Sequence, residues 1–246
     1  NPDSVDLRTI PSAVAGDVAS RRGVVTAASI PAKRLGVKSG EPVSAALRLC
    51  PNLVLVASNF SYYRRKSAAF LEILKRHSSA VEQFSIDEAF LDMSEHFSDR
   101  RQEEAAIRAG ASSIQTEIRE TLGFTVNVGI SENKLLAKMA SDFEKPDKIH
   151  TLWPEEMPQK LCPLPIRALF GVGGQSAEKL LRFGIHTIGE AAATPCEVLQ
   201  RILGPSAGKA VYQSARGINH SAVRRERPQA KSHSVERTTT TDIEKR

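Results

Sequence analysis

Two adjacent carboxylates, Asp87 and Glu88, lie between two short apolar runs in the tract Val81 to Met93. The residues on both sides are strand-forming or easily buried, which predicts a strand, a tight turn and a second strand. Neighbouring side chains of one continuous strand point to opposite faces, so both acids can share a cation only if the chain turns at Ile86 to Glu88. The alternative is an acidic hairpin tip in water, because adjacent acids are common at loop tips.

A second group of residues is basic. Lys33 and Arg34 follow a buried strand predicted over Arg21 to Ala28, and they fall in the first turns of a short helix predicted within Ser29 to Gly36. A helix start can hold phosphate through free N–H groups and cationic side chains. The alternative is a solvated basic helix face.

A glycine-rich tract, Leu169 to Ile185, has the form of a helix-hairpin-helix, in which two helices are joined by a glycine turn. Gly171, Gly173 and Gly174 form the turn, and Lys179 lies in the helix that follows it. Such a turn exposes consecutive backbone N–H groups, which suit a phosphodiester without reading its sequence. The alternative is a glycine turn that only packs.

The elements around the acids predict an α+β arrangement. Apolar residues at three- and four-residue steps, or alternating, predict helices over Pro42 to Leu49, Tyr62 to Arg76, Glu103 to Leu122 and Glu132 to Phe143, and strands over Ser12 to Ala15, Leu53 to Val56 and Phe124 to Ile130. The last strand and the hairpin together predict an antiparallel sheet with helices on one face. Ser131 is the predicted cap of the helix that follows. Lys145 then lies in an extended position set by Pro146.

From Trp153 onward, short helices punctuated by Gly and Pro predict a separate small helical domain, including helices over Glu197 to Leu203 and Ser206 to Arg216. The tract His220 to Ser232 is polar and basic, which predicts a linker able to lie along a phosphate backbone. A strand is predicted to begin within Ser234 to Thr241.

Composition excludes several classes of protein. The chain has 246 residues, of which 41% are hydrophobic and 25% charged, enough for two or more compact units. A net charge of +6 weakly favours a polyanionic partner such as nucleic acid. Cys50, Cys162 and Cys196 are too far apart for a disulfide framework or a zinc site, which fits a reducing cytoplasm. There is no membrane span or signal-peptide pattern, and the start at Asn1 suggests that the beginning has been cut or left out.

Several of these tracts resemble Y-family translesion DNA polymerases, closest to the bacterial DNA polymerase IV type. The matching tracts, which occur in the family's order, are Arg22 to Gly40, Ser85 to Asp92, Val128 to Pro146, Gly171 to Gly173 and Lys231 to Thr238. The resemblance implies fingers over residues 1–59, a palm over 60–152, a helix-hairpin-helix thumb over 153–220, a linker over 221–230 and the start of a little-finger domain over 231–246.

The same resemblance implies an activity and a site. The activity is DNA-templated addition of deoxynucleotides to a primer 3′-OH by low-fidelity, two-metal nucleotidyl transfer. Asp87 and Glu88 are then the catalytic and metal-binding residues for two Mg²⁺ ions, and Lys33 and Lys145 hold the incoming triphosphate. DNA binding falls to Gly171, Gly173, Gly174 and Lys179. The implied partners are primer-template DNA, deoxynucleoside triphosphates and a sliding clamp, with no membrane, in a bacterial cytoplasm at the nucleoid.

The chain departs from the family pattern at several points. The family's first palm strand, which carries a further metal-binding Asp and the bulky residue that excludes ribonucleotides, has no counterpart. Ile30 replaces a Tyr that contacts phosphate, and Lys33 replaces Arg, so that a bidentate fork becomes a point charge. Asp147 and Lys148 replace the usual Asn-Gly.

Two hypotheses from different classes follow. The chain is either part of a polymerase or a catalytically impaired relative that serves as a DNA-binding or recruiting module. Intact Asp87, Glu88 and Lys145 favour the polymerase. The residues upstream of Asn1 discriminate between the two, because a strand with an Asp followed by Phe or Tyr would indicate the enzyme.

Overall fold

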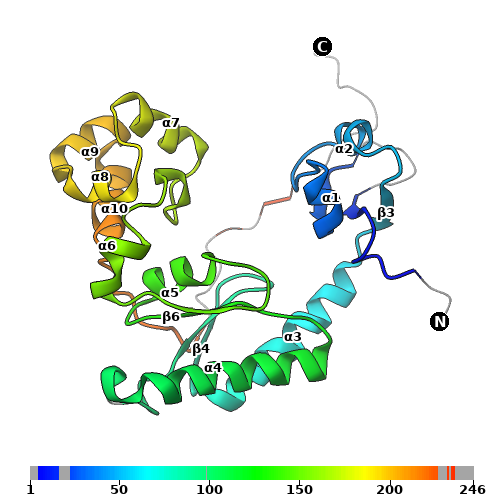
Figure 1. Cartoon of the computed structure of the whole chain (residues 1–246), viewed down its shortest axis with the longest axis horizontal. Coiled ribbons are helices and arrows are strands. Elements are labelled where there is room, and N and C mark those ends of the chain that lie inside the picture. The colour runs from blue at the N-terminus through cyan, green and yellow to red at the C-terminus, as the bar shows by residue number, and fades with distance from the viewer. Residues whose placement is uncertain (1–4, 17–22, 98, 227–231, 233, 236–246) are drawn as a thin grey trace. The chain divides into compact units, whose positions relative to one another are not determined.

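The computed structural model describes residues 5–16, 23–97, 99–226, 232 and 234–235. The chain divides into two compact units, Asn1–Arg65 and Lys66–Arg246. Figure 1 shows the elements of each. No helix within the described ranges is long and apolar enough to cross a membrane. The division at Arg65 lies close to the predicted boundary between fingers and palm, whose position stays a prediction.

The first unit is built on a three-stranded sheet. β1, Ser12–Ala15, pairs antiparallel with β2, Val25–Ala28, and parallel with β3, Val54–Ala57. Small buried side chains, among them Ala15, Val25 and Ala46, form the core. Strands were predicted in all three places, although Arg21 and Arg22, at the predicted start of the second, lie outside the described residues.

Two short helices complete this unit. α1, Ile30–Arg34, begins at Ser29, whose Oγ accepts a hydrogen bond from Ala32 N–H at 3.2 Å and donates one to Ile10 O at 2.8 Å. Of Ser29 and Ile30, the two residues expected at the cap, Ser29 therefore caps the helix. α2 covers Val43–Leu49, close to its prediction.

The second unit contains the hairpin expected around the acidic pair. β4, Ala80–Gln83, pairs antiparallel with β5, Ala89–Asp92. Two long helices, α3 (Phe60–His77) and α4 (Arg100–Leu122), supply the core that packs against this sheet. The buried members of the core are Phe70, Ile73, Leu74, Ile114 and Ile118, with Val81 and Leu91 against them. The two long helices therefore cover one face of the hairpin, in agreement with the predicted α+β class.

The strand predicted from Phe124 to Ile130 is wrong in length and in its partner. β6 covers only Val128–Ile130 and pairs in parallel with β7, Ile149–Thr151, which the sequence did not indicate. Before β6, side chains satisfy the backbone in place of a strand: Gln115 Nε2 donates to Val126 O at 2.8 Å. Within the described residues, the hairpin and β6 therefore belong to separate two-stranded sheets.

The helix after β6 begins two residues later than predicted. α5 covers Lys134–Ser141, and its cap is Asn133, whose Oδ1 accepts from Leu136 N–H at 3.0 Å. Ser131 lies two residues before this cap, and its Oγ donates to Leu152 O at 2.5 Å. Gly129 allows close packing of β6 on α5, since a Cβ there would lie 1.9 Å from Ala137 O.

The remaining helices share one core with α5. They are the 3-10 helices η1 (Pro154–Glu156) and η2 (Ile166–Ala168) and the α-helices α6 (Met157–Lys160), α7 (Gly174–Arg182), α8 (Ile188–Ala193), α9 (Cys196–Leu203) and α10 (Pro205–Ala215). Leu136 and Met139 of α5 are buried with Leu161, Leu180 and Leu199. The predicted helices before Gly204 and Gly217 are confirmed. The strand expected within Ser234 to Thr241 falls largely outside the described residues.

We predict that Gly208→Ala destabilises this helical region. A Cβ at Gly208 would lie 2.4 Å from the Cα and N of Gln200, so α9 and α10 would have to separate. Overpacking of this kind costs about 1–3 kcal/mol of unfolding free energy, measurable by urea denaturation.

The matched control is Gly110→Ala in α4, where the new Cβ meets only Phe97 Cζ at 3.8 Å. Helix propensity predicts that this control gains up to about 1 kcal/mol. Equal effects of the two substitutions would show that the α9–α10 contact is not tight.

Candidate active site and nucleic-acid interface

The loop that joins β4 to β5 fixes the acidic pair. Glu88 O accepts hydrogen bonds from the N–H groups of Phe84 and Ser85, at 2.9 and 3.1 Å, which close the loop. Ser85 Oγ donates to Asp87 Oδ1 at 2.7 Å and so orients that carboxylate. Asp87 is exposed and Glu88 is half-buried. The predicted turn is present, and the serine of the Ser-Ile-Asp-Glu tract makes the hydrogen bond that orients its aspartate.

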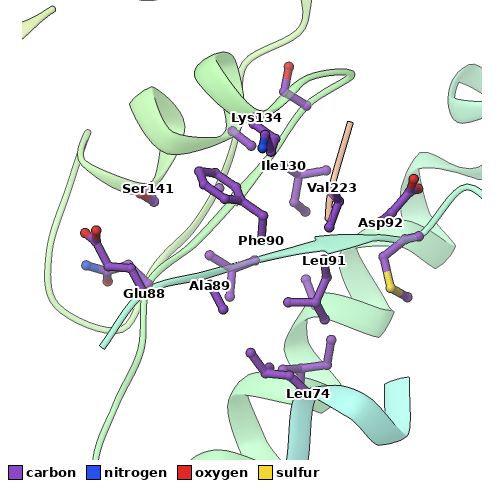
Figure 2. Close-up of a pocket in the computed structure, with 18 of the residues that line it drawn as sticks. Leu74, Glu88, Ala89, Phe90, Leu91, Asp92, Ile130, Lys134, Ser141 and Val223 are labelled. Carbon is purple, nitrogen blue, oxygen red and sulfur yellow. The ribbon is translucent and has the colours of Figure 1, made fainter. Parts of the chain in front are cut away.

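A cavity of about 840 Å³ lies beside this loop. Its lining includes Asp87, Glu88 and Lys145, together with residues of β5, β6, α3, α4 and α5. In Figure 2, Phe90 and Lys134 lie on one side of β5, and Leu91 and Leu74 lie on the other. Three of the four residues that sequence reasoning assigned to the catalytic centre thus border one cavity.

The cavity also borders the free edge of β5. The bond from Phe84 N–H to Glu88 O makes Phe84 and Glu88 a hydrogen-bonded pair. In antiparallel strands, hydrogen-bonded and non-hydrogen-bonded pairs alternate. Glu82 and Phe90 are therefore the next hydrogen-bonded pair, and the backbone groups of Ala89 and Leu91 point away from β4. Both residues line the cavity.

The free edge of β6 borders the same cavity. Val128 N–H donates to Lys148 O at 2.9 Å, and Leu152 N–H donates to Ile130 O at 3.0 Å, so the backbone groups of Gly129 point away from β7. Gly129 also lines the cavity. In the described part of the chain, two unpaired strand edges therefore meet one largely apolar space.

A chain of ion pairs, which we call the charged ladder, links Glu88 to Lys145. Lys138 Nζ lies 2.9 Å from Glu88 Oε1 and 2.9 Å from Asp142 Oδ2, and Lys145 Nζ lies 2.6 Å from Asp142 Oδ1. The Lys138 side chain is only 13% exposed. The sequence analysis gave no role to Lys138 or to Asp142. The spacing of Lys138, Asp142 and Lys145, at steps of four and three, was the available signal.

These contacts change the ionisation of the two middle groups. Burial raises the pKa of Asp142, but hydrogen bonds from Lys145 and Lys138 outweigh it and hold the pKa below its ordinary value. Burial lowers the pKa of Lys138, but its bonds to Asp142 and Glu88 leave that pKa above the ordinary value. Both groups therefore stay charged at neutral pH.

Asp87 and Glu88 have the donor chemistry of a site for a hard divalent cation, because such ions prefer carboxylate oxygens. Ser85 binds only Oδ1 of Asp87, so Oδ2 has no hydrogen bond within the described loop, and one oxygen of Glu88 is paired with Lys138. No group of three or more His, Cys, Asp or Glu side chains that could hold a metal lies within the described ranges. The two carboxylates thus fit part of a metal site.

Lys33 belongs to the first unit, so the structure does not bring it together with the acids. It is exposed and is the fourth of the five residues of α1, with Arg34 after it. The helix has only five residues, so its first and last turns overlap. Lys33 and Arg34 therefore lie as close to the end of the helix as to its start, where phosphate binding was expected.

The glycine turn precedes α7. Gly171 has φ +88°, a conformation that favours glycine, whereas Gly173 has φ −74° and acts as the N-cap. A Cβ on Gly173 or Gly174 would meet nothing within 4 Å, so both border open space. Gly174 is the first residue of α7, and exposed Lys179 lies in its last turn. The first helix of the motif is the 3-10 helix η2, which ends at Ala168, before the predicted tract begins at Leu169.

Comparison with known proteins identifies two regions. Residues 2–142 match the impB/mucB/samB family, and residues 167–219 match the thumb domain of DNA polymerase iota.

Individual relatives agree with these matches. DNA polymerase IV of Clostridium acetobutylicum is 42% identical over 243 residues, 99% of this chain and 60% of the relative. DNA polymerase IV 1 of Bacillus subtilis is 42% identical over 222 residues, 90% of this chain and 52% of the relative. The chain thus spans little more than half the length of these curated relatives.

Solved structures are similar in fold. A crystal structure of DinB from Sulfolobus solfataricus has a TM-score of 0.77 and 28% identity, covering 91% of this chain and 63% of the other. An insertion ternary complex of Dbh DNA polymerase has a TM-score of 0.76 and 29% identity, covering 87% and 62%.

We predict that the stabilising effect of Asp142 depends on pH. Because its pKa is lowered in the folded state, the ionised form stabilises the fold above its unfolded pKa of about 3.9, and this contribution disappears as the pH falls through the folded value. The carboxylate is 42% exposed, so Asp142→Asn should cost less than about 1 kcal/mol at pH 7. Urea unfolding at pH 7 and pH 3 measures the difference.

The control is Glu144→Gln, which removes a longer ion pair, 3.3 Å to Lys148, and should have the smaller effect at pH 7. An Asp142→Asn effect of equal size at both pH values would contradict the role of the charged ladder.

Proposed function

The chain belongs to the impB/mucB/samB family of Y-family DNA polymerases, and we propose that it forms the fingers, palm and thumb of a low-fidelity, DNA-templated DNA polymerase of the translesion type. The observation that carries the proposal is the grouping of Asp87, Glu88 and Lys145 around one cavity. The relatives named above are polymerases, which favours this hypothesis over the impaired DNA-binding relative.

The residues of the hairpin and of the ladder have distinct parts in the proposed reaction. Two bound Mg²⁺ ions would activate the primer 3′-oxygen and neutralise the departing pyrophosphate. Asp87 offers an oriented carboxylate at the end of a rigid loop, and Glu88 offers a second one. Lys145, whose side chain is 56% exposed, supplies positive charge for the triphosphate. Asp142 keeps that ammonium group in place between turnovers.

The first unit and the helical region complete the proposal. Lys33 holds the triphosphate as a point charge, which is weaker than the fork of an arginine. Gly171, Gly173, Gly174 and Lys179 hold the phosphate backbone of primer-template DNA, consistent with the open space above the glycines. The assigned boundaries remain fingers at 1–59, palm at 60–152 and thumb at 153–220.

The two free strand edges support the expectation of a further strand. Ala89, Leu91 and Gly129 offer unpaired backbone groups to a space whose other walls come from α3, α4, α5 and residues 219–223. An extended segment between the edges would join both sheets and satisfy these groups. The family's first palm strand, with its metal-binding Asp, is the proposed occupant. A sliding clamp and a bacterial cytoplasmic location at the nucleoid belong to the same proposal.

In the full-length protein, we predict that Asp87→Asn abolishes primer extension and leaves DNA binding nearly unchanged. A neutral amide is a far poorer ligand for Mg²⁺, whereas affinity for DNA comes mainly from distributed contacts to phosphate. Extension assays and binding titrations at one salt concentration measure the two effects. Extension at the parental rate would remove Asp87 from the site.

For the glycine turn, we predict that Gly173→Val weakens primer-template binding without changing sequence preference. Because φ is −74°, the backbone tolerates a side chain, so the effect comes from the obstructed approach of phosphate. Val is a poorer N-cap than Gly, so stability should fall by up to about 1 kcal/mol. Equal affinities of folded variant and parent would make the turn purely structural.

The test of the whole proposal compares the 246-residue chain with a longer chain that includes the upstream strand. The short chain should bind DNA weakly, with strong salt dependence, and extend primers poorly, because loss of one member of a catalytic group typically costs several orders of magnitude. The longer chain should extend primers with Mg²⁺ and four deoxynucleotides. Comparable extension by both would show that the metal-site assignment is incomplete.

A further inference from the structure

The segment that leaves the helical region, residues 217–225, is fastened to the second unit's sheet and to α5 at three points. We call this segment the connector. At its start, Asn133 Nδ2 donates to Gly217 O at 3.0 Å. Near its end, Arg224 N–H donates to Glu82 Oε2 at 2.7 Å, and Arg225 Nη2 donates to Glu95 Oε1 at 3.1 Å. Val223, between these points, lies beside β5 in Figure 2.

The bond at Glu82 differs from an ordinary surface contact. Glu82 and Lys134 form a 2.8 Å ion pair whose side chains are only 19% and 14% exposed. Lys134 Nζ also lies 5.4 Å from the centroid of the Phe90 ring. A charge this far from water is retained only when its hydrogen bonds are satisfied, and Arg224 N–H supplies one of them to Glu82 Oε2.

The ionisation of Glu82 agrees with this geometry. Burial raises its pKa, but the hydrogen bonds from Lys134 and from Arg224 N–H outweigh burial, so the pKa lies below the ordinary value. Glu82 is therefore charged at neutral pH, which makes it a stronger acceptor for the backbone of the connector.

The two other contacts set the position of the connector but add less binding strength. Arg225 and Glu95 are 63% and 59% exposed, so their pair is worth little alone. At the start, a Cβ on Gly217 would lie 2.6 Å from Met157 Sδ and 3.3 Å from Leu136 Cδ2, so the chain passes close to α5 and α6 there. Glu82 is the buried contact between these two ends.

We propose that Glu82 is a positioning residue that clamps the connector to the hairpin and to α5, and so fixes the helical region relative to the catalytic loop. Glu82 lies on β4, five positions before Asp87, and its partner Lys134 lies on the helix that also carries Lys138. The Glu82 carboxylate thus joins three parts: the β4–β5 hairpin that carries the acids, helix α5 that carries the lysines, and the connector that leaves the proposed thumb. The expected consequence for DNA rests on the proposed function: the clamp holds the thumb ready to bind primer-template.

The first experiment tests the clamp without reference to activity. Amide hydrogen exchange of the full-length protein is measured at Arg224 and at Ala222, an exposed connector residue whose N–H has no hydrogen bond to the described residues. Arg224 should exchange at least about tenfold more slowly than Ala222 after correction for intrinsic rates. Glu82→Ala should abolish the difference, and the control Glu72→Gln, on the exposed Glu72–Lys75 pair, should not. Equal exchange at Arg224 and Ala222 in the parent overturns the clamp.

The second experiment tests the positioning role and leaves the Glu82–Lys134 pair intact. Arg224→Pro removes the N–H donor, Arg224→Ala keeps it while removing the side chain, and Ala222→Pro controls for the stiffness of proline. Because both Arg224 variants lack the basic side chain, they are compared with each other: Arg224→Pro should raise the Kd for primer-template about tenfold above that of Arg224→Ala, with the extension rate at saturating DNA unchanged. An unchanged Kd overturns the positioning role. A parent protein that extends no primer counts against the proposed function instead, while exchange at Arg224 still decides the clamp.

Discussion

The second unit depends on the contact between the β4–β5 hairpin and helix α5. Two lysines of α5, one helical turn apart, bind two carboxylates of the hairpin: Lys134 binds Glu82 and Lys138 binds Glu88. Both ammonium groups are nearly buried, so each needs a carboxylate partner. Loss of Glu82 would leave Lys134 without its ion pair, whereas Lys138 would keep Asp142 if Glu88 were lost. This requirement holds the hairpin in one place against the helix, with the exposed Asp87 at the end of the loop.

The other side of α5 packs against the rest of the second unit, so the contact with the hairpin also positions those elements. Leu136 and Met139 are buried in the core of the helical region, and Gly129 lets β6 lie directly on the same helix. A single eight-residue helix therefore contacts the hairpin, the parallel β6–β7 pair and the helical region. Core interiors pack densely and tolerate little change in volume, so a shift of α5 would be felt in all three.

From Glu88 to Lys145, each charge has a partner of opposite sign, and the proposed catalytic pair, Asp87 and Glu88, remains accessible. Acid and base alternate from Glu88 to Lys145, which lets two carboxylates and two ammonium groups lie close together without net repulsion. Exposure increases along the ladder, from Lys138 at 13% to Lys145 at 56%, so the outermost ammonium group can exchange its partner at the least cost. The chain of ion pairs thus combines a nearly buried ammonium group beside Glu88 with an exposed ammonium group at its far end.

The sequence by itself determined the parts whose causes are local. The hairpin at Asp87 and Glu88, the long helix before Gly123, the cap at Ser29 and the glycine turn before α7 follow from periodicity, capping and turn chemistry that act within a few residues. Only the tertiary structure decided the β6–β7 pairing, the cap at Asn133, the Lys138 and Asp142 ladder, and the bond from Arg224 to Glu82, whose partners are 142 residues apart. Ser131 satisfies the local rule for a cap, but the helix begins two residues later, at Asn133, and the Ser131 hydroxyl donates to the Leu152 carbonyl. Contacts between distant segments depend on which faces and free edges the fold brings together, and no local pattern specifies that.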